Sequence, residues 1–222
     1  MANKEILRVY RTKGQAKRTY DKISKIYDFT AGLFERKSMD MGLNQLDVKE
    51  RETVLEIGFG TGHCLEGIAK TVGGTGKVYG IDISSGMLDI TRKKMEKKGL
   101  ADRVELYCGD AMSVPYQDNM FDAVFMSFTL ELFDTPEIPA VLKEIKRVLK
   151  PKGRLGVVSM SKEDGESRLL KAYEWVHKNF PTMVDCRPIY VEKSIRDAGY
   201  SIKSKEKIKL FGLPGEIVVA KP

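Results

Sequence analysis

The feature of this sequence that most constrains its fold is a glycine-rich segment placed directly after a short apolar run. The run covers residues 54–57, and the segment reads Gly58-Phe59-Gly60-Thr61-Gly62 before a helical pattern begins at residue 63. Glycines allow a sharp strand-to-helix turn and the close approach of a ligand to the backbone. In open α/β sheets, ligands bind in the crevice at the carboxyl ends of the strands. The segment therefore predicts an α/β fold with a ligand site at this turn.

The rest of the chain continues this alternation of strands and helices. Apolar runs at residues 78–83, 104–108, 121–128 and 154–160 are separated by helical patterns near 63–71, 84–98 and 136–150. Continuous apolar strands between helices are typical of a parallel sheet that is covered on both faces. Further helices near 169–175 and 191–198 precede two final strands, at 202–211 and 216–220, and we expect Gly212-Leu213-Pro214-Gly215 to join them as a hairpin. A length of 222 residues suits one such domain, residues 1–222.

The glycine spacing indicates which ligand the turn accepts. A dinucleotide-binding turn has the spacing GxGxxG, whereas this one reads GxGxG, with Glu56 two residues before its first glycine. A carboxylate there disfavours a pyrophosphate and stabilises a positively charged group, such as the α-amino group of S-adenosylmethionine (SAM).

Carboxylates also close the next two apolar runs. Asp82 is placed to accept hydrogen bonds from both hydroxyls of a ribose; its alternative is a helix N-cap, which Ser84 fills equally well. Asp110 closes the following strand and is suited to an adenine amino group, with a turn-capping role as the alternative.

In this order the motifs resemble the class I SAM-dependent methyltransferases, and the resemblance covers residues 20–220. The motifs are Glu56 to Gly62, Asp82 with Ser84 to Leu88, Gly109-Asp110-Ala111, Phe121 to Val124, and Leu149 to Gly153. The resemblance implies a Rossmann-like seven-stranded sheet of order 3-2-1-4-5-7-6 with strand 7 antiparallel and helices on both faces. It also implies a SAM-binding core at residues 50–160, followed by helices and a C-terminal hairpin at 161–222.

The same resemblance implies SAM as the cofactor, S-adenosylhomocysteine as the product, and a set of cofactor-binding residues. These are Tyr20, Tyr27, Glu56, Gly58, Gly60, Gly62, Asp82, Ile83, Met87, Asp110, Ala111 and Ser127. Met87 would pack on the adenine, or it is a methionine of the core.

Within this superfamily the chain looks like the ubiquinone and menaquinone C-methyltransferases. The likeness rests on Tyr20-Asp21, Tyr27-Asp28, Ser161-Lys162 and the stretch from Asp197 to Tyr200. Those enzymes carry an Arg-Asn pair after the fourth strand, where this chain reads Ser127-Phe128-Thr129-Leu130-Glu131. Phospholipid amine methyltransferases share much of the layout. The implied acceptor is therefore a small or lipid-like molecule, either a quinol-type ring or a phospholipid amine.

Methyl transfer to a ring carbon requires a base for the quinol hydroxyl, whereas an amine needs only desolvation and deprotonation. The candidate bases are Glu131, which follows the fourth strand, and His177, with a structural role as the alternative for both. Residues 1–36 are expected to form a helical lid over the site. Its aromatic residues would enclose the sulfonium by cation–π contact or pack on the domain; they are Tyr20, Tyr27, Phe29 and Phe34.

Positive charge is concentrated at the start of the chain. The net charge is +7, and residues 1–26 contain eight lysines and arginines against two acids. Such a patch attracts phosphate, so we expect either peripheral association of residues 4–25 with an anionic membrane or a solvated helix face. No apolar run is long enough to cross a bilayer and no signal peptide is visible, which favours the cytoplasm, with contact at the inner membrane face. Three cysteines without CxxC spacing predict no metal site.

Three other functions fit parts of the pattern. An RNA methyltransferase would use the basic patch, but the chain lacks the Asn/Asp-Pro-Pro-aromatic turn of enzymes that methylate base amines, so nucleic acid is not the expected partner. A nicotinamide-dependent oxidoreductase conflicts with the glycine spacing and the hairpin. A non-catalytic SAM-binding protein would keep the same cofactor motifs, and turnover distinguishes it. The oligomeric state is left open.

Overall fold

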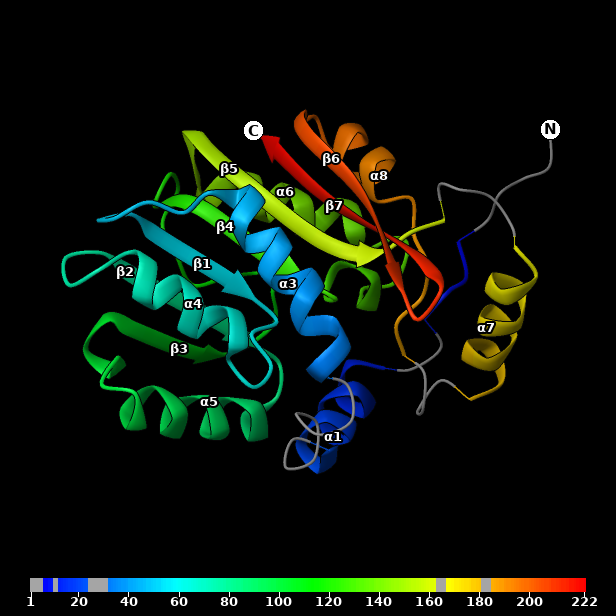
Figure 1. The fold of residues 1–222 in the computed structure, drawn as a ribbon, viewed down its shortest axis with the longest axis horizontal. Coiled ribbons are helices and arrows are strands. Elements are labelled where there is room, and N and C mark those ends of the chain that lie inside the picture. The colour runs from blue at the N-terminus through cyan, green and yellow to red at the C-terminus, as the bar shows by residue number, and fades with distance from the viewer. Residues whose placement is uncertain (1–5, 10–11, 24–31, 163–166, 181–184) are drawn as a thin grey trace.

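The computed structural model describes residues 6–9, 12–23, 32–162, 167–180 and 185–222 (Figure 1). The strands are β1 (Thr53–Ile57), β2 (Lys77–Asp82), β3 (Val104–Cys108), β4 (Phe121–Ser127), β5 (Leu149–Met160), β6 (Ser201–Leu210) and β7 (Leu213–Lys221). The helices are α1 (Lys13–Ile23), α3 (Gly32–Leu46), α4 (His63–Thr71), α5 (Ser85–Lys97), α6 (Ile138–Val148), α7 (Arg168–Asn179) and α8 (Val191–Asp197), with short 3-10 turns η1 (Ala101–Arg103) and η2 (Leu130–Leu132).

All seven strands form one sheet in the order β3-β2-β1-β4-β5-β7-β6, which confirms the predicted fold. β1 to β5 run parallel, and β7 lies antiparallel between β5 and β6. The direction in which strands are added reverses between β1 and β4. From β1 the chain adds β2 and β3 on one side, and it then adds β4 and β5 on the other side of β1. That reversal opens the crevice in which ligands bind in such sheets.

Alternate residues of the central strands belong to two separate apolar cores, one on each face of the sheet. Val54 packs with the helices α3, α4 and α5, while its neighbour Leu55 packs with α6 and α8 on the opposite face. This alternation follows from the two-residue period of a strand. The parallel strands are therefore apolar on both faces, as the continuous apolar runs predicted.

Helix α3 packs closely on the sheet. A Cβ atom on Gly42 would lie 2.3 Å from Val158 Cγ2, so only glycine permits this approach of α3 to β5. Leu46, in the last turn of α3, is fully buried. From Gly42 onward α3 is therefore part of the sheet's helical layer.

Two predicted boundaries are wrong. Helix α6 ends at Val148 and β5 begins at once, pairing Leu149 with Phe121 before its register shifts, because Pro151 and Gly153 interrupt the ladder with a bulge. The hairpin turn is Phe211-Gly212, not residues 212–215. Both turn residues have positive φ, 53° and 82°, a two-residue turn whose twist matches that of the strands.

Within the described residues, no helix combines the length and apolar character needed to span a bilayer.

Candidate functional site

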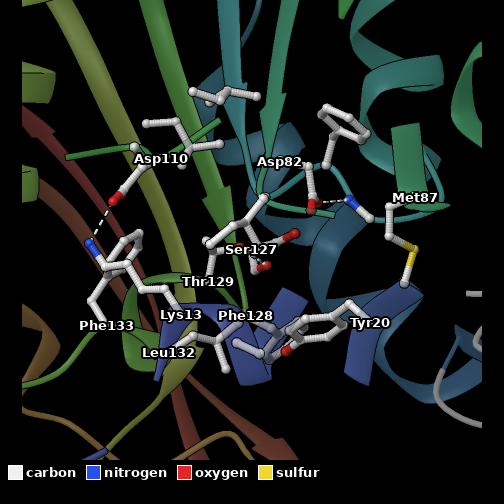
Figure 2. Close-up of a pocket in the computed structure, with 18 of the residues that line it drawn as sticks. Lys13, Tyr20, Asp82, Met87, Asp110, Ser127, Phe128, Thr129, Leu132 and Phe133 are labelled. Carbon is white, nitrogen blue, oxygen red and sulfur yellow. Dashed lines mark hydrogen bonds and ion pairs between the residues drawn. The ribbon is translucent and has the colours of Figure 1, made fainter. Parts of the chain in front are cut away.

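A cavity of about 510 Å³ lies at the carboxyl ends of β1, β2, β3 and β4, where the fold predicts the site (Figure 2). Residues of the N-terminal segment, from Arg8 to Tyr20, form part of its wall. Both the sheet edge and the first helix therefore enclose one space, and its size lies in the range of roughly 300–1,000 Å³ that is usual for small-molecule sites.

The glycine turn forms the floor of this cavity. Gly58 has a φ of 73°, and a Cβ atom there would lie 2.3 Å from Thr129 Oγ1. Gly60 lines the cavity, and its carbonyl accepts a 2.8 Å hydrogen bond from Thr91 Oγ1. Gly62 is absent from the wall: its φ is 75°, and a Cβ atom would meet Thr91 Cγ2 at 2.6 Å. The predicted Gly62 thus shapes the start of α4 instead of contacting the cavity.

Glu56 is a buried carboxylate at the cavity wall. Its Oε2 has no hydrogen-bond partner among the described residues, and only 2% of the residue is exposed. Burial, and secondarily the nearby charge of Asp82, raises the pKa of Glu56 well above its usual value. A buried carboxyl group without a partner is costly. This part of the wall therefore favours a ligand that brings a hydrogen-bond donor or a positive charge.

Asp82 is held by two backbone groups. Its Oδ2 accepts from Gly60 N and its Oδ1 from Ser84 N, both at 2.9 Å. The helix N-cap that was its alternative role is taken by Ser84, whose Oγ accepts from Met87 N at 3.1 Å. Asp82 therefore projects into the cavity as a fixed acceptor (Figure 2).

The N-terminal segment is tied to the cavity rim by ion pairs. Lys13 Nζ lies 2.5 Å from Asp110 Oδ2 and 3.2 Å from Glu137 Oε1. Arg8 binds both carboxylate oxygens of Asp134 and, with a backbone N–H, holds the pKa of Asp134 well below its usual value. The other oxygen of Asp110 accepts from Met112 N at 3.0 Å, which is its alternative turn-capping role.

The structure brings most of the predicted cofactor residues to the cavity wall. Those that line it are Tyr20, Glu56, Gly58, Gly60, Asp82, Ile83, Met87, Asp110, Ala111 and Ser127. Met87 is 2% exposed and belongs to the core, and it also lines the cavity, so its position is compatible with either alternative. Tyr27 lies outside the described residues.

Apolar residues after β4 also line the cavity, beside the ion pairs of Arg8 and Lys13, and sequence reasoning missed them. Phe128, Leu132 and Phe133 follow β4 and line the cavity together with Thr129 (Figure 2). Phe128 has a φ of 50°, a strained conformation for an aromatic residue, which tends to persist where a site depends on it. The only sequence signal for this wall was that residues 127–131 lack the Arg-Asn pair of the quinone enzymes.

Neither predicted base lines the cavity. Glu131 is fully buried behind the wall, where Oε1 accepts from Met160 N at 3.2 Å, and burial raises its pKa to about 7. His177 is buried on α7. His63, by contrast, lines the cavity, with its Nε2 lying 2.8 Å from Asp40 Oδ1.

Comparison with known proteins supports the fold and the class of domain. Residues 54–153 match the protein family described as methyltransferase domain. A SAM-dependent methyltransferase from Aquifex aeolicus aligns with a TM-score of 0.65 at 26% identity, covering 96% of this chain and 100% of that one. The chain has the fold of the class I SAM-dependent methyltransferases and carries a methyltransferase domain over residues 54–153. The cyclase SpnF aligns with a TM-score of 0.76 at 22% identity over 97% of both chains, a likeness that shows the fold alone.

Two curated relatives carry the same name. A demethylmenaquinone methyltransferase from Lactobacillus johnsonii is 41% identical over 117 residues, which are 53% of this chain and 47% of that protein. One from Staphylococcus aureus (strain MRSA252) is 36% identical over 152 residues, 68% of this chain and 59% of that protein. The chain thus matches between about half and three fifths of these relatives' length.

The cofactor of this family is SAM, and the cavity fits it. Glu56 supplies a buried carboxylate with a vacant position, which suits the positively charged amino group of SAM. Asp82 supplies a fixed acceptor for ribose hydroxyls, and the glycine turn lets the ligand approach the backbone.

Proposed function

We propose that this protein methylates a quinol-type ring carbon with SAM, with a phospholipid amine as the second candidate acceptor. The observation that carries the quinol is the presence of Phe128, Leu132 and Phe133 on the cavity wall, since apolar side chains suit a flat aromatic ring. The names of the curated relatives, demethylmenaquinone methyltransferases, support the same acceptor class. A phospholipid amine does not require apolar residues at this wall, so they favour the quinol.

In this proposal the residues of the sheet edge hold SAM. Glu56 binds the amino group, Asp82 binds the ribose, and Met87 packs on the adenine. Asp110 accepts from the adenine amino group once its pairing with Lys13 is released. Ile83, Ala111, Ser127 and Tyr20 contribute the remaining contacts.

The reaction forms a carbon–carbon bond and breaks a carbon–sulfur bond. When bound, SAM supplies a methyl carbon that its sulfonium has already activated. The protein holds the quinol ring in line with it at about 3–3.5 Å and excludes water. The quinol hydroxyl gives up a proton, the ring carbon attacks and then loses its own proton, and S-adenosylhomocysteine leaves. His63, oriented by Asp40, is placed on the cavity wall to accept a proton, whereas Glu131 and His177 would need a relay.

We further propose that residues 1–222 act as one domain in which residues 1–36 serve as a lid, 50–160 as the SAM-binding core and 161–222 as the closing helices and hairpin. Supporting this, the single sheet extends from β1 to β7. Asp21 also ties α1 to α5: its Oδ1 accepts from Ser84 Oγ at 2.6 Å and from Gly86 N at 2.9 Å.

A lipid-like acceptor also calls for contact with the inner face of the cytoplasmic membrane. The basic residues between 4 and 25 are the first candidates for this contact. Two of them, Arg8 and Lys13, are engaged with Asp134, Asp110 and Glu137 at the cavity rim, which lowers their availability to lipid phosphate.

The test is transfer of a labelled methyl group from SAM to a reduced demethylmenaquinone analogue, with the product identified by mass spectrometry. We expect a C-methylated ring, and loss of turnover in Asp82→Asn but not in the matched variant Asp118→Asn, an exposed partner of Arg147. Label on phosphatidylethanolamine instead would select the phospholipid acceptor.

The fold by itself does not guarantee methyl transfer, because SpnF, named a cyclase, shares it. A protein that binds SAM but forms no methylated product with quinols, phospholipids or RNA would fit that alternative or a non-catalytic role.

A further inference from the structure

The segment 185–187, which precedes α8, holds two residues of the cavity wall without lining the cavity itself. Tyr20 donates a hydrogen bond from its hydroxyl to Asp185 Oδ2, and Arg187 donates one from Nη2 to Phe133 O. Tyr20 and Phe133 lie on opposite sides of the cavity in Figure 2. One short segment therefore connects α1 to the wall that follows β4.

The sheet and α7 anchor this segment. Tyr173 of α7 donates from its hydroxyl to Cys186 O at 3.0 Å. Just beyond the segment, Ile189 O accepts from Lys162 N at 3.0 Å, and Ile189 N donates to Met160 O at 3.3 Å, next to the end of β5. Side chains that shape a site work best when their supports are themselves fixed, and the segment gives both wall residues such a support.

Arg187 also acts on the N-terminal segment, through the residue next to Phe133. Asp134 binds Arg8 through both of its carboxylate oxygens, and its Oδ1 accepts from Val9 N at 3.0 Å. A shift of the Phe133 carbonyl would move Asp134 with it. The hydrogen bond from Arg187 therefore supports the ion pair that ties the N-terminal segment to the cavity rim.

Arg187 is costly for the fold. It is fully buried, and its Nε and Nη1 have no hydrogen-bond partner among the residues that the structure describes. Burial lowers the pKa of Arg187 to about 10, although the nearby charges of Asp134 and Glu131 oppose the shift. An apolar side chain of similar size would avoid this cost. Residues that break a rule of stability are expected where function depends on them.

Asp185 lies in a similarly unfavourable place. After burial, the charge of Asp185 is the second reason why the pKa of Glu35, on α3, rises to about 7. Two carboxyl groups near each other oppose folding when both are charged. The contact that offsets this in the structure is the hydrogen bond from Tyr20.

We propose that Asp185 and Arg187 are positioning residues of the cavity, Asp185 through Tyr20 on the cofactor side and Arg187 through Phe133 on the acceptor side. The parts that Tyr20 and Phe133 play toward SAM and the acceptor rest on the proposed function. The support that Asp185 and Arg187 give to the two walls does not.

A double-mutant cycle on SAM affinity, measured by titration calorimetry, tests Asp185. Asp185→Ala and Tyr20→Phe should each weaken SAM binding by roughly three- to tenfold. The double variant should lose no more than either single variant, because both remove the same hydrogen bond. Asp185→Asn keeps an acceptor for the Tyr20 hydroxyl and should recover most of the affinity. Additive losses, or wild-type affinity in Asp185→Ala, would overturn the role of Asp185.

Tyr200→Phe is the matched control for this cycle. It also removes a buried tyrosine hydroxyl, which donates to Leu142 O at 2.9 Å, but neither residue lines the cavity. Its SAM affinity should equal that of the wild type. A loss as large as in Tyr20→Phe would mean that the effect reflects general stability, which would also overturn the proposal.

Hydrogen exchange at Val9 tests Arg187 without any substrate. Arg187→Met should speed this exchange about fivefold or more, because Asp134 is no longer held in place. Its melting temperature should equal or exceed that of the wild type. Arg154→Met removes an arginine that donates to the carbonyls of Leu46 and Asp47, and it should leave exchange at Val9 unchanged. Wild-type exchange in Arg187→Met would overturn the role of Arg187.

Turnover separates this proposal from the proposed function. With a soluble demethylmenaquinone analogue in reduced form, Arg187→Met should raise the KM for the quinol about fivefold or more and keep the SAM affinity. An unchanged KM would overturn the acceptor-side role of Arg187. If the wild-type protein methylates no quinol, the proposed function fails, and the SAM cycle and the exchange at Val9 still decide whether Asp185 and Arg187 position the two walls.

Discussion

At the scale of single residues, the glycine turn is shaped by contacts with side chains that are distant in sequence. Gly58 faces Thr129 and Gly62 faces Thr91, so each glycine is required both by its positive φ and by a close neighbour. Gly73 has a similar φ, 71°, but nothing lies within 4 Å of a Cβ atom there. A substitution at Gly73 therefore measures backbone strain alone, whereas one at Gly58 measures strain and steric clash together.

The variant Gly58→Ala should be less stable than Gly73→Ala by about 1–3 kcal/mol, because it adds a clash with Thr129 to the strain that both share. Chemical denaturation measures this difference. Adding Thr129→Ala to Gly58→Ala should restore part of the loss. Equal losses in the two single variants would mean that Thr129 moves aside without cost.

At the scale of elements, helix α1 depends on a contact with the N-terminus of α5. Asp21 accepts two hydrogen bonds there, and although burial opposes the shift, the bonds from Ser84 and Gly86 lower the pKa of Asp21. The same helix carries Lys13 and Tyr20 to the cavity wall. Asp21 is therefore a positioning residue for this wall.

The variant Asp21→Ala should weaken SAM binding by roughly three- to tenfold, the effect of about one lost hydrogen bond. Titration calorimetry measures it. Asp21→Asn keeps an oxygen acceptor and should recover much of the affinity, and Arg18→Ala, on the exposed side of α1, is the control. An Asp21→Ala protein that binds SAM as the wild type does would show that α1 is not needed for the cofactor.

At the scale of the whole molecule, buried carboxyl groups link stability to pH. Burial raises the pKa values of Glu35 and Glu131 to about 7, so the folded protein keeps protons that the unfolded chain releases near its ordinary pKa of about 4.5. Stability from such groups is complete below the unfolded pKa and is lost as the pH rises through the folded pKa.

The free energy of unfolding should therefore fall between about pH 5 and pH 8, with Glu131 contributing up to about 3 kcal/mol. Glu131→Gln should flatten this decline because an amide does not titrate, and its oxygen can still accept the hydrogen bond from Met160 N. Glu96→Gln, on the exposed side of α5, should leave the profile unchanged. A wild-type slope in Glu131→Gln would mean that this carboxyl group is ionised in the folded protein.

Local sequence determined the order of elements and the cofactor end of the site. Glycine spacing, Asp82 and Asp110 lie within or next to the strands that position them, so their places followed from the chain itself. The bulge at the start of β5 and the Phe211-Gly212 turn were not foreseen, because strand pairing overrides local helix and turn preferences.

Only the tertiary structure decided the rest of the site. Arg8 pairs with Asp134 and Lys13 with Asp110 across more than 90 positions of sequence, and no local pattern encodes such ion pairs. Burial likewise removed Glu131 from the cavity and turned Trp175 to solvent, because side-chain direction depends on how helices pack. The sequence by itself thus determined the fold and the cofactor class, whereas packing between distant segments decided the cavity wall after β4, the contacts of α1 and the outer surface.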